Sequence, residues 1–149
     1  RRVNRERGAA LGAPLGGHLV AGHVDARVAV RRREPAGEAE RFTVALPADG
    51  ALARQIAAKG SVCLDGISLT VNGVTADAFD AMVVPLTLRT TTLGERRPGD
   101  LLNLETDVLA KYVARQLERG AAGDGDAERD RAERDGVTLE QLVQSGFAR

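Results

Sequence analysis

The sequence predicts an all-β domain of about six strands, with a short helix between strands and a longer helix near its C-terminal end. β-Branched or alternating segments recur along most of the chain, and Gly, Pro and Asp turn signals separate them. The chain has 149 residues, of which 43% are apolar, so it can bury one core of ordinary size. These observations favour one compact domain flanked by tails.

The six expected strands are short segments rich in Val, Leu, Ile and Thr. They span residues 19–30, 40–46, 61–64, 67–74, 78–84 and 101–105. Asp65-Gly66 joins the third to the fourth and favours a tight type I′ hairpin. Ser68 and Thr70 are two residues apart, so they project from one face of the fourth strand while Leu69 projects from the other. A polar pair on one face is either solvated or directed at a ligand.

Helical spacing appears in three places. Residues 50–58 predict a short helix that ends at Lys59-Gly60. Residues 108–117 predict a helix with Asp107 as N-cap and Gly120 as C-cap. A charged Gly- and Asp-rich linker and a short apolar helix follow at residues 120–149.

Composition argues against several function classes. Lys and Arg together number 21, as do Asp and Glu, and aromatic residues make up 3% of the chain, so nucleic-acid binding is disfavoured. No apolar run approaches the roughly 20 residues of a membrane span. The single cysteine, Cys63, leaves no intrachain disulfide and no cysteine cluster for zinc, which fits a reducing compartment such as the cytoplasm.

A four-residue pattern occurs twice. Val3-Asn4-Arg5-Glu6 and Leu102-Asn103-Leu104-Glu105 share an apolar-Asn-x-Glu pattern about one barrel's length apart. The repetition predicts that the chain opens on the last strand of a preceding copy of the same module.

Four stretches in one order and spacing resemble the C-terminal half of riboflavin synthase alpha chains. They are "GGHLVAGHVD" from Gly16, "KGSVCLDGISLTVNGV" from Lys59, "VVPLTLRTTTLG" from Val83 and "GDLLNLETDVLAKYVAR" from Gly99. The resemblance implies a six-stranded antiparallel Greek-key barrel that binds lumazine. It divides the chain into the end of a preceding barrel or linker (1–12), the barrel (13–106), an oligomerisation helix (107–119) and a tail (120–149).

The family's activity is the dismutation of two 6,7-dimethyl-8-ribityllumazine molecules to riboflavin and 5-amino-6-(D-ribitylamino)uracil, a transferase reaction without metal or redox cofactor. The reaction needs an acidified methyl group, a stabilised anion and two pteridines held face to face. The resemblance implies that this chain carries the second of two barrels. It also implies assembly into a trimer through the helix at 107–119, although that helix's apolar stripe is explained nearly as well by packing on its own barrel.

The site residues come from four matched segments. The resemblance assigns catalytic roles to His23, Ser68 and Thr70, and substrate contacts to Gly22, His23, Val24, Lys59, Ser68, Leu69, Thr70, Val83, Val84, Pro85, Leu86, Thr87 and Leu88. Family members commonly have His or Glu where this chain has Leu86, so a polar contact there is not expected. An imidazole titrating near neutrality suits proton transfer at His23.

Structural roles compete with functional ones at several of these residues. Asp65 is explained by the hairpin turn, with a carboxylate beside Lys59 as the alternative. Lys59 also suits a helix C-terminus. His18 is expected to orient a loop, and Cys63 to be a core residue on the side of the hairpin opposite Ser68. His18 and His23 are spaced five apart with no third ligand, so no metal site is expected.

Two other functions remain open beside the synthase. One is a barrel that binds lumazine or flavin without turnover. The other, a flavin-binding barrel of a reductase, is disfavoured because no Gly-rich phosphate loop or nucleotide-binding partner domain is recognisable.

Overall fold

The structure is a computed structural model that describes residues 2–5, 10, 12 and 14–121. The chain divides into two compact units, Arg1–Tyr112 and Val113–Arg149, and each is described by itself. The expected linker and short terminal helix fall almost entirely within residues 122–149, which lie outside the described residues.

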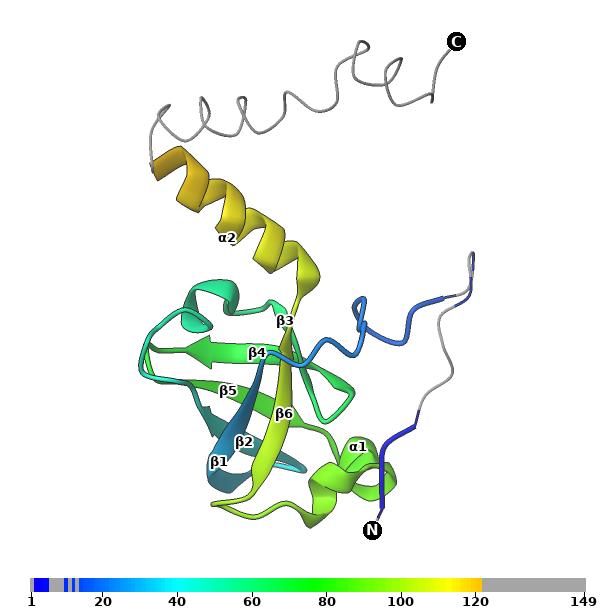
Figure 1. The fold of residues 1–149 in the computed structure, drawn as a ribbon. Helices are drawn as coiled ribbons and strands as arrows, with labels where there is room; N and C mark the ends of the chain where they lie inside the picture. Colours follow the sequence, from blue (N-terminus) through cyan, green and yellow to red (C-terminus); the bar gives the residue numbers. More distant parts are fainter. Residues whose placement is uncertain (1, 6–9, 11, 13, 122–149) are drawn as a thin grey trace, which may run out of the picture. The chain divides into compact units, whose positions relative to one another are not determined.

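Within the described part of the first unit, six strands close into a barrel (Figure 1). They are β1 (Ala26–Ala36), β2 (Ala39–Ala45), β3 (Ser61–Leu64), β4 (Ile67–Val74), β5 (Ala78–Val83) and β6 (Leu101–Thr106). Their order is β1-β2-β5-β4-β3-β6, and each neighbouring pair is antiparallel. Strands β3 to β5 follow one another as hairpins and β6 returns beside β3, which is a Greek-key path. The expected Greek-key barrel is confirmed.

Apolar side chains at alternate positions of the strands fill the inside of the barrel. Phe42, Val44, Val62, Leu64 and Leu104 are each completely buried, and Phe79 is 1% exposed. Burial of one such side chain stabilises the fold by about 2 kcal/mol. The interior is therefore a packed core.

The β3–β4 hairpin has the geometry that the sequence predicts. Asp65 and Gly66 have φ values of 49° and 82°, as a type I′ turn requires at both central residues. Leu69 and Val71 are buried while Thr70 is exposed, so the two faces of β4 differ as expected.

Strand β1 begins later than expected. It starts at Ala26 instead of residue 19, and it continues through charged residues to Ala36 because they pair with β2. The preceding residues do not extend the strand. Gly22 has a φ of 78°, and its backbone N–H is bonded to a side chain, as described below.

The helices between strands differ from expectation. The expected helix at 50–58 is only the 3-10 turn η1 (Ala53–Gln55), because Ile56 adopts an extended conformation that takes its side chain into the core. Lys59 then has a φ of 68°. Helix α1 (Pro85–Thr90) and the 3-10 turn η2 (Thr92–Glu95) were not expected. Pro85 lies in the first turn of α1, where its missing N–H costs no hydrogen bond.

Helix α2 (Val108–Ala121) confirms the expected C-terminal helix, but the expected C-cap at Gly120 is wrong, because Gly120 lies within the helix, which continues to Ala121. The Asp107 carboxylate accepts a hydrogen bond from the backbone N–H of Leu109 at 2.9 Å, which is the N-cap that the sequence predicts. Four apolar side chains of α2 are exposed: Leu109, Tyr112, Val113 and Leu117. No helix among the described residues is long and apolar enough to span a membrane.

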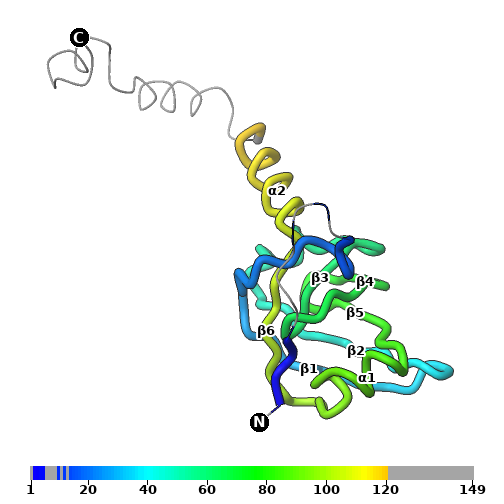
Figure 2. The backbone as a smooth tube through the Cα atoms, turned by 90° about the vertical axis from the view of Figure 1, so that its right-hand side faces the viewer, coloured from blue at the N-terminus to red at the C-terminus, as the bar shows by residue number. Residues whose placement is uncertain are grey.

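The segment before β1 and the first residues of the chain both lie against the barrel. The first residues contact the β3–β4 turn and η2 through Asn4, while the segment leading into β1 lies near β3, β4 and β6 (Figure 2). The second of these contacts is described below.

Candidate functional site

A row of three side chains crosses the outer face of β6, β3 and β4. Cys63 pairs with Ser68 on one side and with Glu105 on the other. Directly paired residues point to the same face of a sheet, so these three side chains lie together. Since Val62, Leu64 and Leu69 point inward, the row lies outside the core. Cys63 is buried, at 2% exposure, as expected. The expectation that it faces away from Ser68 is wrong, because the two residues pair directly.

Residues 17–22 cover this row. The Nδ1 atom of His18 lies 2.8 Å from Ser68 Oγ. Further along, the Glu105 carboxylate accepts hydrogen bonds from the backbone N–H groups of Ala21 and Gly22, at 2.8 and 3.0 Å. Glu105 is only 6% exposed, so its charge is held by two backbone donors beneath an irregular segment.

The close approach of this segment depends on Gly17. A Cβ atom there would lie 2.2 Å from Ser68 Oγ and 2.6 Å from Ser68 Cβ. Only glycine therefore allows the backbone to pass over Ser68 and bring His18 against the hydroxyl.

The imidazole of His18 has one polar atom without a partner. Its Nε2 atom is buried and makes no hydrogen bond to any described residue. Leaving a buried polar atom unpaired costs about 1–3 kcal/mol. His18 and Ser68 therefore form a partly buried polar pair that retains one unpaired nitrogen beneath the chain's own atoms.

The other expected site residues fall into three groups by burial. Leu69 and Val83 face the core, with 8% and 0% exposure, so only their backbone atoms can meet a ligand on the outer face. Exposed residues form the second group: Gly22, His23, Val24, Lys59, Thr70, Val84 and Leu86. Pro85, Thr87 and Leu88 are half-buried in α1.

The structure brings His18, not His23, to Ser68. No hydrogen bond joins His23 to another described residue. The five-residue spacing of the two histidines does not reveal which one turns toward the sheet. Each histidine follows a glycine, Gly17 or Gly22, so the adjacent residue gives no signal either.

A second polar cluster joins the start of β1 to the end of β6 and the start of α2. Asp25 accepts hydrogen bonds from the Thr106 backbone N–H at 2.8 Å and from Lys111 Nζ at 2.8 Å. Thr106 Oγ1 lies 3.0 Å from Asp25 Oδ2 and 2.8 Å from Gln55 Oε1, so its one proton is donated to one of them at a time. Burial alone would raise the pKa of Asp25, but the bonds from Lys111 and Thr106 hold that pKa below its ordinary value.

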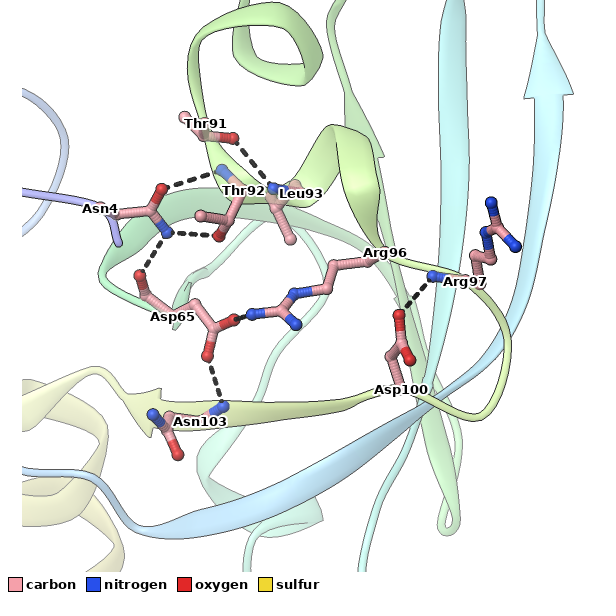
Figure 3. Close-up of polar contacts among 9 residues, drawn as sticks. All are labelled: Asn4, Asp65, Thr91, Thr92, Leu93, Arg96, Arg97, Asp100 and Asn103. Atoms are coloured by element: carbon pink, nitrogen blue, oxygen red, sulfur yellow. Dashed lines mark hydrogen bonds and ion pairs between the residues drawn. The ribbon is translucent and has the colours of Figure 1, made fainter. Parts of the chain in front are cut away.

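Asp65 is held by residues other than Lys59 (Figure 3). Its carboxylate pairs with Arg96 at 2.7 Å and accepts the Asn103 backbone N–H at 2.9 Å. The alternative of a carboxylate acting beside Lys59 is therefore not supported, and Asp65 belongs to the turn and its anchors.

The comparisons with known proteins agree on one family. A model of the lumazine binding domain matches residues 21–107. A riboflavin synthase from Brucella abortus (strain 2308) is 51% identical over 115 residues, covering 77% of this chain and 56% of that protein. One from Mycobacterium bovis is 49% identical over 119 residues, covering 78% and 58%. The chain thus spans a little over half the length of these curated relatives.

Solved structures share the barrel. The crystal structure of LumP complexed with riboflavin has a TM-score of 0.58 at 21% identity, covering 64% of this chain and 50% of that one. LumP complexed with 6,7-dimethyl-8-(1'-D-ribityl) lumazine gives 0.56 at 18% identity, covering 66% and 51%. At such identities the likeness supports the fold.

Proposed function

The chain belongs to the lumazine binding domain family, and on that premise we propose that it is the C-terminal barrel of a riboflavin synthase. The reaction is the dismutation of two 6,7-dimethyl-8-ribityllumazine molecules to riboflavin and 5-amino-6-(D-ribitylamino)uracil, in riboflavin biosynthesis. The observation that carries the proposal is the match to named riboflavin synthases at 49–51% identity over more than three quarters of the chain.

Ser68 and Thr70 supply the hydroxyls in this proposal. Both project from the outer face of β4, and Ser68 already contacts His18. A pteridine has ring nitrogens and carbonyl oxygens along one edge, so paired hydroxyls suit its recognition. His23 is exposed directly after residues 17–22, which cover Ser68. We assign proton transfer to it.

The remaining expected contacts are proposed as walls of the ligand site. Val24, Val84 and Leu86 are exposed apolar side chains, at 53%, 52% and 62%. Covering such side chains with a flat heterocycle removes apolar surface from water, which favours binding by about 25 cal/mol per Å². Lys59, Gly22, Pro85, Thr87 and Leu88 complete the proposed contacts.

Dismutation needs two pteridines, whereas one barrel supplies one site. Proximity of the two rings supplies much of the rate acceleration in such a reaction. We therefore propose that the active assembly brings this barrel against a second one, in a cytoplasmic trimer formed through the exposed apolar stripe of α2.

A barrel that binds lumazine or flavin without turnover is the second candidate. One observation favours it: the matched LumP structures are complexes with flavin mononucleotide, riboflavin and the lumazine. This candidate has the same ligand site as the synthase, but it forms no product.

One experiment separates the candidates. The chain is titrated with 6,7-dimethyl-8-ribityllumazine by fluorescence, and the mixture is then incubated and assayed for riboflavin. Binding with riboflavin formation supports the synthase. Binding without product supports the second candidate only if riboflavin still fails to form after the N-terminal barrel of a riboflavin synthase is added in excess, because the synthase proposal itself requires a second barrel. Absence of binding contradicts the ligand site common to both.

A further inference from the structure

Three consecutive arginines on β1 differ in their surroundings. Arg31 and Arg32 are exposed and form ion pairs at the surface, whereas the side chain of Arg33 is only 21% exposed. Arg33 pairs directly with Phe42 on β2, and its Cζ atom lies 5.3 Å from the centroid of the Phe42 ring. Since Phe42 is completely buried, Arg33 lies on the core side of the sheet.

All three nitrogens of the Arg33 guanidinium donate hydrogen bonds. Nε and Nη2 bind the two carboxylate oxygens of Glu40, and these bonds hold the pKa of Glu40 below its ordinary value. Nη1 donates to the carbonyl of Gly94 at 3.0 Å and to the carbonyl of Arg96 at 2.6 Å. We name the Arg33–Glu40 pair with these two carbonyl contacts the arginine clamp.

The arginine clamp lies at both ends of the segment that leaves the barrel after β5. Glu40 is paired with Val83, the last residue of β5, so one side of the clamp is where the chain leaves the barrel. Gly94 and Arg96, whose carbonyls bind the guanidinium, are where the chain returns from η2 toward β6. Residues 84–93 lie between these points and contain α1. One ion pair therefore fixes both ends of the segment that contains α1.

The return point of this segment is also in contact with α1 itself. A Cβ atom at Gly94 would lie 2.0 Å from the carbonyl oxygen of Leu88, so the two backbones touch. Leu88 belongs to α1, and its backbone N–H donates to the Val84 carbonyl at 3.1 Å. Arg96 is held a second time, by the ion pair of its own guanidinium with Asp65 at 2.7 Å (Figure 3). The position of α1 depends on this connected set of contacts.

Helix α1 has little stability of its own. It is six residues long and none of them is buried. Isolated helices shorter than about 12 residues are marginal in water. The conformation of α1 is therefore decided by the contacts that fix its ends.

The start of α1 carries two of the proposed ligand walls, the exposed side chains of Val84 and Leu86. A segment that is ordered before the ligand arrives binds more tightly, because less conformational freedom is lost on binding. We infer that Arg33 is a positioning residue for lumazine binding, which acts through the arginine clamp by holding α1 in the conformation that receives the heterocycle. The inference rests on the proposed function, since α1 is a ligand wall only there.

Arg33→Lys in the 149-residue chain tests the inference. Lysine keeps a positive charge opposite Glu40, but it lacks the planar fork that reaches the carboxylate and both carbonyls together. The matched control is Arg31→Lys, two positions earlier on β1, at the exposed ion pair with Asp77.

Two readouts separate positioning from a general loss of stability. In the ligand-free chain, hydrogen exchange at the backbone amides of Leu88 and Arg96 should be about tenfold faster in the Arg33 variant, while the β4 amide of Val71, bonded to the Gly60 carbonyl, should exchange at its original rate. Fluorescence titration with 6,7-dimethyl-8-ribityllumazine should give a Kd raised about fivefold. The control should change neither readout.

Circular dichroism checks folding. If Arg33→Lys does not fold, Arg33→Gln combined with Glu40→Gln replaces it, because the double variant leaves no unpaired charge. Equal acceleration of all three amides, or of none, would overturn the clamp and leave Arg33 as a contributor to stability alone. Faster exchange at Leu88 with an unchanged Kd would overturn the link to the ligand. If the unsubstituted chain does not bind the lumazine, the proposed function and the ligand role of Arg33 fail together, whereas the exchange rates still decide whether the clamp holds α1.

Discussion

The imidazole of His18 and the hydroxyl of Ser68 are hydrogen-bonded at 2.8 Å, although fifty positions separate them in the chain. The bond fixes the orientation of a hydroxyl that faces out of the barrel. Nδ1 of His18 is committed to Ser68, whereas the buried Nε2 atom has no partner among the described residues.

Removing either outer hydroxyl of β4 should weaken lumazine binding with the fold intact. Ser68→Ala or Thr70→Ala loses one ligand hydrogen bond, worth about 1 kcal/mol or roughly fivefold in Kd. Fluorescence titration measures this. Thr75→Ala, directly after the end of β4, removes a hydroxyl that bonds to Asp77 and Ala78 and should leave Kd unchanged. Unchanged Kd in both test variants would remove the hydroxyls from the site.

The two histidines should respond differently to substitution. His18→Ala frees the Ser68 hydroxyl to rotate, so Kd for the lumazine should rise about fivefold, corresponding to about 1 kcal/mol. His23→Ala should leave Kd nearly unchanged and slow riboflavin formation, if the chain forms it, because its proposed role is proton transfer. The opposite pattern, with affinity lost only at His23, would assign ligand recognition to that residue.

Gly17→Ala should displace the segment that covers Ser68. The added Cβ would overlap Ser68 Oγ, and the backbone must move to relieve it. We expect loss of lumazine affinity larger than that of Ser68→Ala, with a nearly native circular dichroism spectrum because the barrel is unaffected. Gly120→Ala is the control, since a Cβ atom there has no neighbour within 4 Å. Native affinity in the Gly17 variant would show that this approach is unimportant for binding.

Glu105→Gln should destabilise the covering segment. A carboxylate accepts both the Ala21 and the Gly22 N–H groups, whereas an amide has one accepting oxygen and places its own N–H₂ against a donor. We expect a loss of about 1–3 kcal/mol in unfolding free energy or faster local exchange of these two amides. Urea unfolding and hydrogen exchange measure the two effects. Exposed Glu38→Gln should change neither, and equal behaviour of the two variants would contradict the role of Glu105.

Asp25 should contribute stability that is lost in acid. Its pKa is below the ordinary value in the folded protein, so its contribution is present above the unfolded pKa of about 3.9 and disappears as pH falls through the lowered folded value. Asp25→Asn should therefore lower Tm at pH 7, and the gap to the unsubstituted chain should narrow as pH falls from about 4 to 2. Asp49→Asn, at an exposed turn, provides the comparison. A gap that stays constant with pH would show that the charge of Asp25 does not stabilise the fold.

The hairpin of β3 and β4 could be predicted almost to the residue because its signals are local. Asp65-Gly66 specifies the turn, and alternation specifies the two faces of β4. Helix α2 was predictable for the same reason, from its cap and its apolar spacing.

The covering segment could not be predicted, because its structure is decided by partners far along the chain. Residues 19–25 are rich enough in Val and Leu to resemble a strand. The hydrogen bonds of Ala21 with Glu105 and of His18 with Ser68 nevertheless hold the segment in an irregular path. Helix α1 was missed for a different reason. Its sequence "PLTLRT" has more β-branched residues than a typical helix, and the helix is only six residues long.

Core and candidate site alternate along the same strands, with Val62 and Leu69 directed inward and Cys63 and Ser68 directed outward. The selective pressures on adjacent positions are consequently different. A substitution at an inward position changes the stability of the fold, and one at an outward position changes the surface of the proposed ligand site. Under the proposed function, the ligand preference of such a barrel can change through every second residue of β3 and β4, while the residues between them preserve the fold.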